Sequence, residues 1–134
     1  MGQIIDTCVW VDHLRKTTPD ATRRVADAAV NEPDALLCEP VRFELLYGAS
    51  RRERRLLTRL LGTMPIVQTP AQLWPDAATL ATQACDVGLR VPSLDLLIAA
   101  LCIHHDIALT TFDAHFEKLA SLSKLRVNLL RRPD

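Results

Sequence analysis

Short apolar runs alternate along this chain with longer segments whose apolar residues recur at helical spacing. The short runs cover residues 4–6, 35–38, 107–111 and 125–130, with a weaker run at 66–67. Runs of this length that alternate with helical segments are typical of parallel strands joined by helical crossovers. The pattern therefore predicts an α/β fold with a central, mainly parallel sheet of about four to five strands.

Capping signals place the predicted helices between these strands. Thr18 is expected to cap a helix that carries a proline in its first turn and ends near residue 30. Pro40 begins a helix that Gly48 interrupts. The other predicted helices cover residues 9–14, 51–61, 72–87, 92–105 and 114–122. The helix at 51–61 is strongly amphipathic, because five arginines lie opposite an apolar face of Leu56, Leu57, Leu60 and Leu61.

Length and composition narrow the class of protein. A chain of 134 residues with 49% hydrophobic residues can bury the core of one domain, which we expect to span residues 1–134. No apolar stretch is long enough to cross a membrane, so we expect a cytoplasmic protein. Sixteen basic residues balance sixteen acidic ones, so any binding of nucleic acid must come from local patches. The widely spaced cysteines are expected to be buried and reduced: Cys8, Cys38, Cys85 and Cys102.

Acidic residues stand where a parallel sheet usually binds its ligands, beyond the carboxyl ends of the strands. Asp6 closes the first strand, Asp113 follows the strand at 107–111, and Asp95 lies in the first turn of a helix. Near the second strand there are two candidates, Glu39 at its end and Glu44 one helical turn later. The topology alone slightly favours Glu39.

Each acid taken alone also has a purely structural interpretation. Asp6 and Asp113 suit helix N-caps, and Asp95 suits the positive end of a helix dipole. Gathered in one cleft, however, these carboxylates would repel one another unless a cation compensated them. Oxygen ligands without a nearby cysteine or histidine pair favour Mg²⁺ or Mn²⁺.

Four short motifs occur in a fixed order along nearly the whole chain. They are IIDTCVW at 4–10, ELLYG at 44–48, SLDLLIAA at 93–100 and TTFDAHF at 110–116. The first resembles the opening of a PIN domain, and the others are similar to its ExxxG, DxLIAA and TxDxDF segments. Together they resemble the PIN-domain ribonucleases of the VapC toxin type, which implies a three-layer α/β/α fold.

The resemblance also implies the site residues. Asp6, Glu44, Asp95 and Asp113 would be catalytic, and the three aspartates among them would hold Mg²⁺ or Mn²⁺. Glu39 then becomes a neighbour of the site. Supporting hydroxyl groups would come from Thr7, Ser93 and Thr111. Many relatives carry a second aspartate where this chain has His115, which changes the expectation for a second metal ion.

The activity implied by the resemblance is metal-dependent endonucleolytic cleavage of RNA that leaves a 5′-phosphate and a 3′-hydroxyl. The implied partners are the RNA, a second copy of the chain in a homodimer, and a VapB-like antitoxin, through which alone DNA would be involved. We expect the antitoxin to occupy a groove formed by Val9, Trp10 and Leu14 with the helices at 41–61. Arginines of the amphipathic helix would either hold RNA phosphates or form a solvated face: Arg51, Arg52, Arg54, Arg55 and Arg59.

Other classes of protein fit the sequence less well. An aspartyl phosphatase would need an acid two residues after Asp6, where this chain has Cys8. A dinucleotide-binding module would need a glycine-rich turn after the first strand, and a receiver domain an N-terminal acidic pair. The remaining alternative is a PIN-fold protein that binds or regulates without catalysis.

Overall fold

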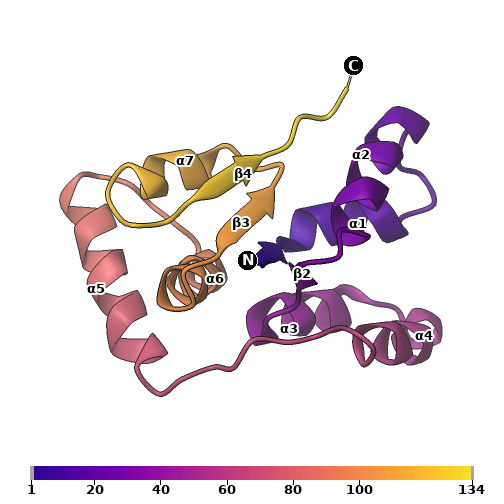
Figure 1. The fold of residues 1–134 in the computed structure, drawn as a ribbon, viewed down its shortest axis with the longest axis horizontal. Coiled ribbons are helices and arrows are strands. Elements are labelled where there is room, and N and C mark those ends of the chain that lie inside the picture. The colour runs from indigo at the N-terminus through magenta and orange to yellow at the C-terminus, as the bar shows by residue number, and fades with distance from the viewer. Residues whose placement is uncertain (1, 134) are drawn as a thin grey trace.

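A computed structural model describes residues 2–133 of the chain as a parallel sheet flanked by helices (Figure 1). The strands are β1 (Gln3–Ile5), β2 (Ala35–Leu36), β3 (Ala108–Thr111) and β4 (Val127–Leu129). The helices are α1 (Thr7–Leu14), α2 (Asp20–Val30), α3 (Glu39–Gly48), α4 (Arg51–Leu61), α5 (Leu73–Asp86), α6 (Ser93–His104) and α7 (His115–Ala120). The predicted α/β fold with a parallel sheet is confirmed.

The order of the strands brings the ends of β1 and β3 together. The sheet has the order β2-β1-β3-β4, and every pair is parallel. The chain runs from β1 to β2 through α1 and α2, then returns past β1 to β3. Figure 1 shows α1 and α2 on one side of the strands, with α5, α6 and α7 on the other. The carboxyl ends of β1 and β3 therefore flank the point where the chain reverses its direction across the sheet, where ligands commonly bind.

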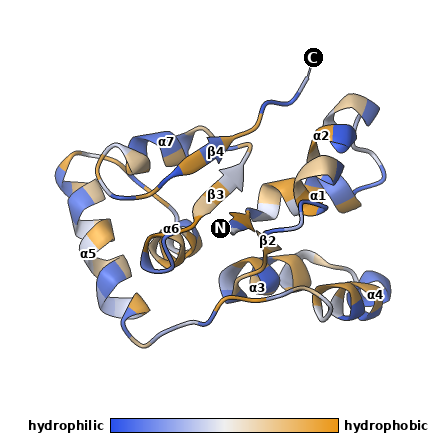
Figure 2. Cartoon of the chain, in the orientation of Figure 1, coloured by the Kyte–Doolittle hydropathy of each residue, from blue (hydrophilic) through white to orange (hydrophobic). Residues whose placement is uncertain are grey.

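The strands lie in the core because helices cover them from both sides. Ile4, Ile5 and Leu109 are fully buried in the two central strands. Helix α6 is buried along its centre, from Ile98 to Cys102, which explains its nearly continuous apolar sequence. Figure 2 shows hydrophobic residues on the strands and along α6. This packing holds the first residues after β1 and β3 in fixed positions.

Two local predictions were wrong. Thr18 does not cap α2, because the N-cap is Pro19 and makes no side-chain hydrogen bond. The carbonyl of Thr18 instead accepts a hydrogen bond from Arg23. Residues 66–67 do not form a strand, because only a single parallel bridge joins Ile66 to Leu37 before the chain turns toward α5.

Helix α4 has the predicted bounds, and Ser50 caps it through a reciprocal capping box with Glu53. The prediction that four leucines of α4 form its buried face is correct for only two of them. Leu57 and Leu61 are buried, whereas Leu56 is 68% exposed, and Leu60 is exposed as well. The reason is that α4 packs on the rest of the protein along one side only, next to α3.

The prediction that all four cysteines are buried is wrong for two of them. All four thiols are free, and Cys38 and Cys102 are buried as expected, but Cys8 is only partly buried and Cys85 is exposed near the end of α5. Between residues 2 and 133, no helix is both long enough and apolar enough to span a bilayer.

Candidate active site

A cavity of about 360 Å³ opens beyond the carboxyl ends of β1 and β3. It brings together side chains from the start and end of the chain and from its middle. The lining residues are Asp6, Thr7, Cys8, Val11, Asp12, Arg15, Glu44, Asp95, Asp113 and Arg132. All four acids expected to be catalytic lie in this one cavity.

Asp6 lies at the junction between β1 and α1 and is 5% exposed. One carboxylate oxygen, Oδ1, accepts a hydrogen bond from the backbone of Thr7 as the N-cap of α1. The other, Oδ2, accepts the hydroxyl of Thr111 at 2.7 Å and the thiol of Cys8 at 3.3 Å. Asp6 is therefore both a helix cap and an oriented member of the acidic cavity, so the two interpretations of this residue are compatible.

The structure separates the two glutamate candidates. Glu44 lines the cavity, and its Oε1 accepts the hydroxyl of Thr7 at 2.7 Å. Glu39 is exposed in the first turn of α3 and pairs with Arg42 at 2.8 Å. Because five residues turn the helix through more than one full turn, the two side chains leave α3 in different directions. The slight preference of the strand topology for Glu39 is not supported by this geometry.

Among the four acids, Asp95 has a clearly shifted pKa. It lies in the first turn of α6, where its side chain is 19% exposed. Burial, together with the charge of Asp6, raises the pKa of Asp95 from 3.8 to about 6. His115 opposes this shift, while Glu44 and Asp113 add to it. Negative charges are therefore crowded in this cavity.

His115 connects two of the acids. Its Nδ1 lies 2.6 Å from Oδ1 of Asp113, which also accepts the backbone N–H of His115. Its Nε2 lies 3.1 Å from Oδ2 of Asp95, in an alignment that does not form a hydrogen bond. The imidazole thus stands between Asp95 and Asp113, at the position where the resemblance implies an aspartate in many relatives.

The three expected hydroxyl groups behave differently. Thr7 donates to Glu44, and Thr111 donates to Asp6 while accepting the backbone N–H of Asp113 at 3.0 Å. Thr111 is fully buried, and its hydroxyl connects the carboxylate of Asp6 to the backbone of Asp113. Ser93 is exposed and makes no side-chain hydrogen bond to the acids among residues 2–133.

Five further lining residues were not singled out for the site from the sequence: Cys8, Val11, Asp12, Arg15 and Arg132. Cys8 and Asp12 lie four residues apart on one face of α1, and Arg15 follows three residues later at the C-cap of this helix. Their spacing after Asp6 is the pattern from which the sequence could have predicted them as cavity residues. Burial raises the pKa of the Cys8 thiol to about 12, which keeps it a neutral hydrogen-bond donor. Arg132 comes from the segment after β4, where no sequence pattern pointed to it.

The predicted metal site is not assembled as a ligand cage. Among the described residues, no three His, Cys, Asp or Glu side chains are grouped closely enough to hold an ion. The chemistry of the donors nevertheless fits a hard cation, since the cavity gathers five carboxylates and raises the pKa of one of them. A cation would offset that repulsion.

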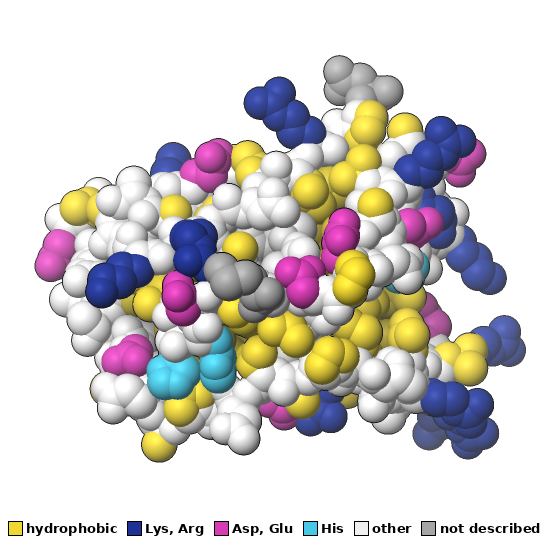
Figure 3. Space-filling model, in the orientation of Figure 1, with side chains coloured by type: hydrophobic (Ala, Val, Ile, Leu, Met, Phe, Trp, Pro, Cys, Tyr) yellow, Lys and Arg dark blue, Asp and Glu magenta, His cyan; other side chains and the backbone are white. Residues whose placement is uncertain are grey.

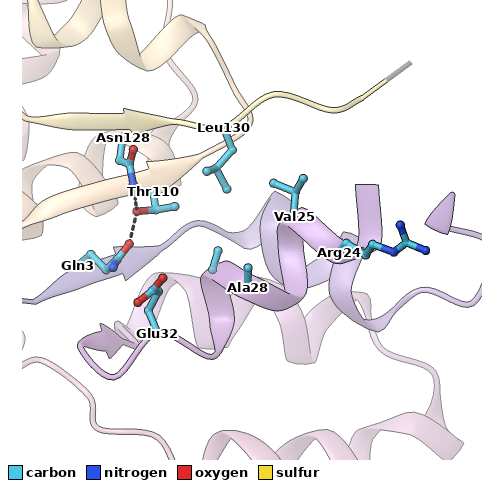
Figure 4. Close-up of a pocket in the computed structure, with 9 residues that line it drawn as sticks. Gln3, Arg24, Val25, Ala28, Glu32, Thr110, Asn128 and Leu130 are labelled. Atoms are coloured by element: carbon cyan, nitrogen blue, oxygen red, sulfur yellow. Dashed lines mark hydrogen bonds between the residues drawn. The ribbon is translucent and has the colours of Figure 1, made fainter. Parts of the chain in front are cut away.

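A second cavity, of about 440 Å³, lies between α2 and the strands (Figure 4). Asn128 donates a hydrogen bond to Thr110, whose hydroxyl donates in turn to Gln3 at 2.5 Å. These polar groups are paired with one another. Glu32 is the only acid in the lining, so this cavity lacks the crowded carboxylates of the first one.

Comparison with known proteins agrees with the fold. The PIN-domain family profile matches residues 4–122. Ribonuclease VapC11 from Mycobacterium tuberculosis is 31% identical over 132 residues, covering 96% of this chain and 98% of that protein. A parallel α/β sheet with this sequence match makes the chain a member of the PIN-domain family. Within that family it belongs to the VapC ribonucleases of VapBC toxin–antitoxin systems.

Solved structures extend the likeness in fold. VapBC2 from Rickettsia felis, bound to a DNA fragment from its promoter, has a TM-score of 0.75 at 21% identity, over 97% of this chain and 99% of that one. VapBC-5 from Mycobacterium tuberculosis has a TM-score of 0.72 at 18% identity, over 96% and 98%. At these identities the comparison concerns the fold, and both structures share it along nearly the whole chain.

Proposed function

We propose that this chain is a metal-dependent endoribonuclease that acts as the toxin of a toxin–antitoxin pair. The observation that carries the proposal is the convergence of Asp6, Glu44, Asp95 and Asp113 in one cavity beyond the sheet. The 31% identical relative is named as a ribonuclease, which supports the same reaction class. Cleavage of RNA would inhibit translation or growth until an antitoxin bound the enzyme.

Asp6, Asp95 and Asp113 are the residues that would hold Mg²⁺ or Mn²⁺. Such an ion, when bound, supplies Lewis acidity for the hydrolysis of a phosphodiester and lowers the pKa of its bound water. Thr111 holds Asp6 through one carboxylate oxygen and the backbone of Asp113 through its own oxygen. This contact keeps the two ends of the ligand set in register, as supporting hydrogen bonds do in metal sites.

Glu44 is proposed to handle the proton of the attacking water. Its Oε1 is fixed by the Thr7 hydroxyl, and its Oε2 has no hydrogen-bond partner among residues 2–133. That oxygen is therefore available to accept a proton within the cavity. Thr7 restricts the carboxylate to one orientation, which reduces the freedom lost when the reacting groups come together.

The test is cleavage of labelled tRNA, ribosomal RNA and messenger RNA by the purified, antitoxin-free protein with Mg²⁺ or Mn²⁺. We expect discrete cuts that disappear with EDTA and in the Glu44→Gln variant. Glu39→Gln is the matched control, because it removes the same charge from the same helix outside the cavity. A folded wild-type protein that cuts none of these RNAs would instead favour the alternative of a PIN-fold binding protein.

The antitoxin is proposed to bind a groove of about 620 Å³ that adjoins the acidic cavity. Both are lined by Val11, Arg15 and Glu44. The expected groove residues need correction, because Val9 and Trp10 are buried in the core. Leu14 does line the groove, together with Leu45 and Leu57 from α3 and α4. Structures of VapBC complexes support a protein partner of this kind.

If the proposal is right, the toxin will co-purify with a small antitoxin, whereas independent migration of the two on gel filtration would contradict it.

The α4 arginines remain candidates for RNA binding. All five are exposed, and Figure 3 shows basic side chains gathered at the α4 end of the molecule. None of them lines the acidic cavity, so any contact with RNA would lie away from the cleaved bond. Reversing the charges of Arg51, Arg55 and Arg59 should weaken RNA binding and flatten its salt dependence. An unchanged slope of log affinity against log salt would indicate a solvated face.

We also propose that the chain forms a homodimer, and light scattering would measure its mass in solution.

A further inference from the structure

We propose that Arg132 binds a phosphate group of the RNA at the rim of the acidic cavity, held in position by Asp12 and Phe112. This inference rests on the proposed ribonuclease function and adds a substrate-binding residue to it. The cavity lining contains two basic residues among the described part of the chain, Arg15 and Arg132. A substrate with a charge at every nucleotide must enter a cavity lined by five acids, so a cation at its rim has a direct electrostatic use.

The guanidinium group of Arg132 is oriented by two contacts. Its Nε donates to Oδ2 of Asp12 at 2.8 Å. Its central carbon lies 4.5 Å from the centre of the Phe112 ring, in a cation–π contact. Asp12 is in turn mostly buried on α1, with its side chain 14% exposed. The long side chain of Arg132 is thus held against two fixed parts of the protein, helix α1 and Phe112, the residue that follows β3.

This arrangement leaves the outer edge of the guanidinium group available. Neither terminal nitrogen, Nη1 or Nη2, has a hydrogen-bond partner within residues 2–133, and the side chain is 51% exposed. Arginine presents its donors in a rigid planar fork that matches the oxygens of a phosphate. Because Asp12 takes only the Nε edge, the fork keeps two nitrogens for a ligand.

Phe112 also connects Arg132 to the acidic cavity through its place in the chain. Phe112 lies between Thr111, which orients Asp6, and Asp113, which lines the cavity. The ring that supports Arg132 is therefore attached on both sides to the acidic site. A phosphate bound by Arg132 would lie next to the acids rather than on a remote surface, unlike one bound by the α4 arginines.

The neighbouring Arg131 provides a matched control. It carries the same charge one residue earlier and is exposed, but it does not line the cavity. We therefore compare Arg132→Gln with Arg131→Gln, which are equal in net charge. Thermal unfolding of both variants will show that each remains folded, and Arg132→Lys keeps the charge but removes the planar fork.

Binding is measured by fluorescence anisotropy with a labelled single-stranded RNA of twelve nucleotides, in an Asp95→Asn background with Mg²⁺ so that the RNA stays intact. We expect Arg132→Gln to weaken binding roughly tenfold, as the loss of a charge-assisted hydrogen bond predicts. The slope of log affinity against log salt should fall by about 0.7, the value for one phosphate contact on a single strand. Arg131→Gln should change both quantities much less.

Cleavage kinetics separate this inference from the proposed function. In the otherwise wild-type enzyme, Arg132→Gln should raise KM while changing kcat little, and Asp12→Asn should have a smaller effect that disappears when Arg132 is already absent. Arg132→Lys should restore part of the affinity. If the wild-type protein cleaves RNA and the Arg132 and Arg131 variants have equal KM values, this inference is wrong and the proposed function stands. If no RNA is cleaved by the wild-type protein, the proposed function fails, and unchanged binding by Arg132→Gln would overturn the phosphate contact independently.

Discussion

Replacing Asp95 by asparagine should stabilise the metal-free protein at neutral pH. The pKa of this carboxyl rises from 3.8 to about 6 because it is buried beside other acids. Each pKa unit corresponds to about 1.4 kcal/mol, so ionising Asp95 in the folded protein costs on the order of 3 kcal/mol of stability. The cavity is open to water and the variant also loses the contact with His115, so we expect a net gain of roughly 1–2 kcal/mol.

The sign of the pH dependence follows from the raised pKa. Below about pH 3 the carboxyl is mostly protonated in both the folded and the unfolded protein, so Asp95→Asn should change stability little there. As pH rises from 4 through 6, the wild-type protein loses stability that the variant keeps. The difference in free energy of unfolding should therefore grow across this window and level off above about pH 7.

Urea unfolding in EDTA, at one-unit intervals from pH 4 to pH 8, measures this difference. Asp86→Asn is the control, because Asp86 is exposed at the end of α5 and its variant should show no such growth. Adding Mg²⁺ at ten times its dissociation constant should stabilise the wild-type protein by about 1.4 kcal/mol at pH 7, and the Asp95 variant by much less. A difference between wild type and variant that is the same at pH 4 and pH 8 would refute the argument from crowded charge.

Three further substitutions test the structure at other points. Thr111→Val should keep the fold but lower kcat roughly 10- to 100-fold in the cleavage assay, because Asp6 loses an orienting hydrogen bond; normal activity would mean that this contact is dispensable. Leu57→Ala should cost about 2–4 kcal/mol in urea unfolding and Leu56→Ala less than about 0.5, since only Leu57 is buried; equal costs would contradict the position of α4. Ser50→Ala should cost about 1 kcal/mol in the same assay by removing the capping box, and no loss would show that α4 needs no cap.

Much of the architecture could be predicted from local patterns. The helix over 51–61 has the predicted bounds because its leucines and arginines follow the spacing of an amphipathic helix. Strands are less exact: β4 spans only Val127–Leu129, although the apolar run is longer. Strand ends depend on whether a neighbouring strand is present to receive hydrogen bonds, which no local pattern specifies.

Two of the predicted acids, Asp6 and Asp113, lie together because of the strands that precede them. Asp6 and Asp113 each follow a parallel strand, and parallel neighbours end at the same edge of a sheet. The choice between Glu39 and Glu44 was different. Both are near β2, and only the direction in which each side chain leaves α3 places Glu44 in the cavity and Glu39 beside Arg42.

The amino-acid sequence by itself determined the α/β class, most helices and the position of Asp6 and Asp113 just after two strands, since these follow from periodicity, capping and strand order. Only the tertiary structure decided that Ser93 stays in solvent, that His115 stands between two acids and that Arg132 reaches the rim of the cavity. These features depend on the packing of segments distant in the chain: Arg132 contacts Asp12 across 120 positions. Local propensity carries no information about such a contact, because its energy exists only after the sheet has brought the two segments together.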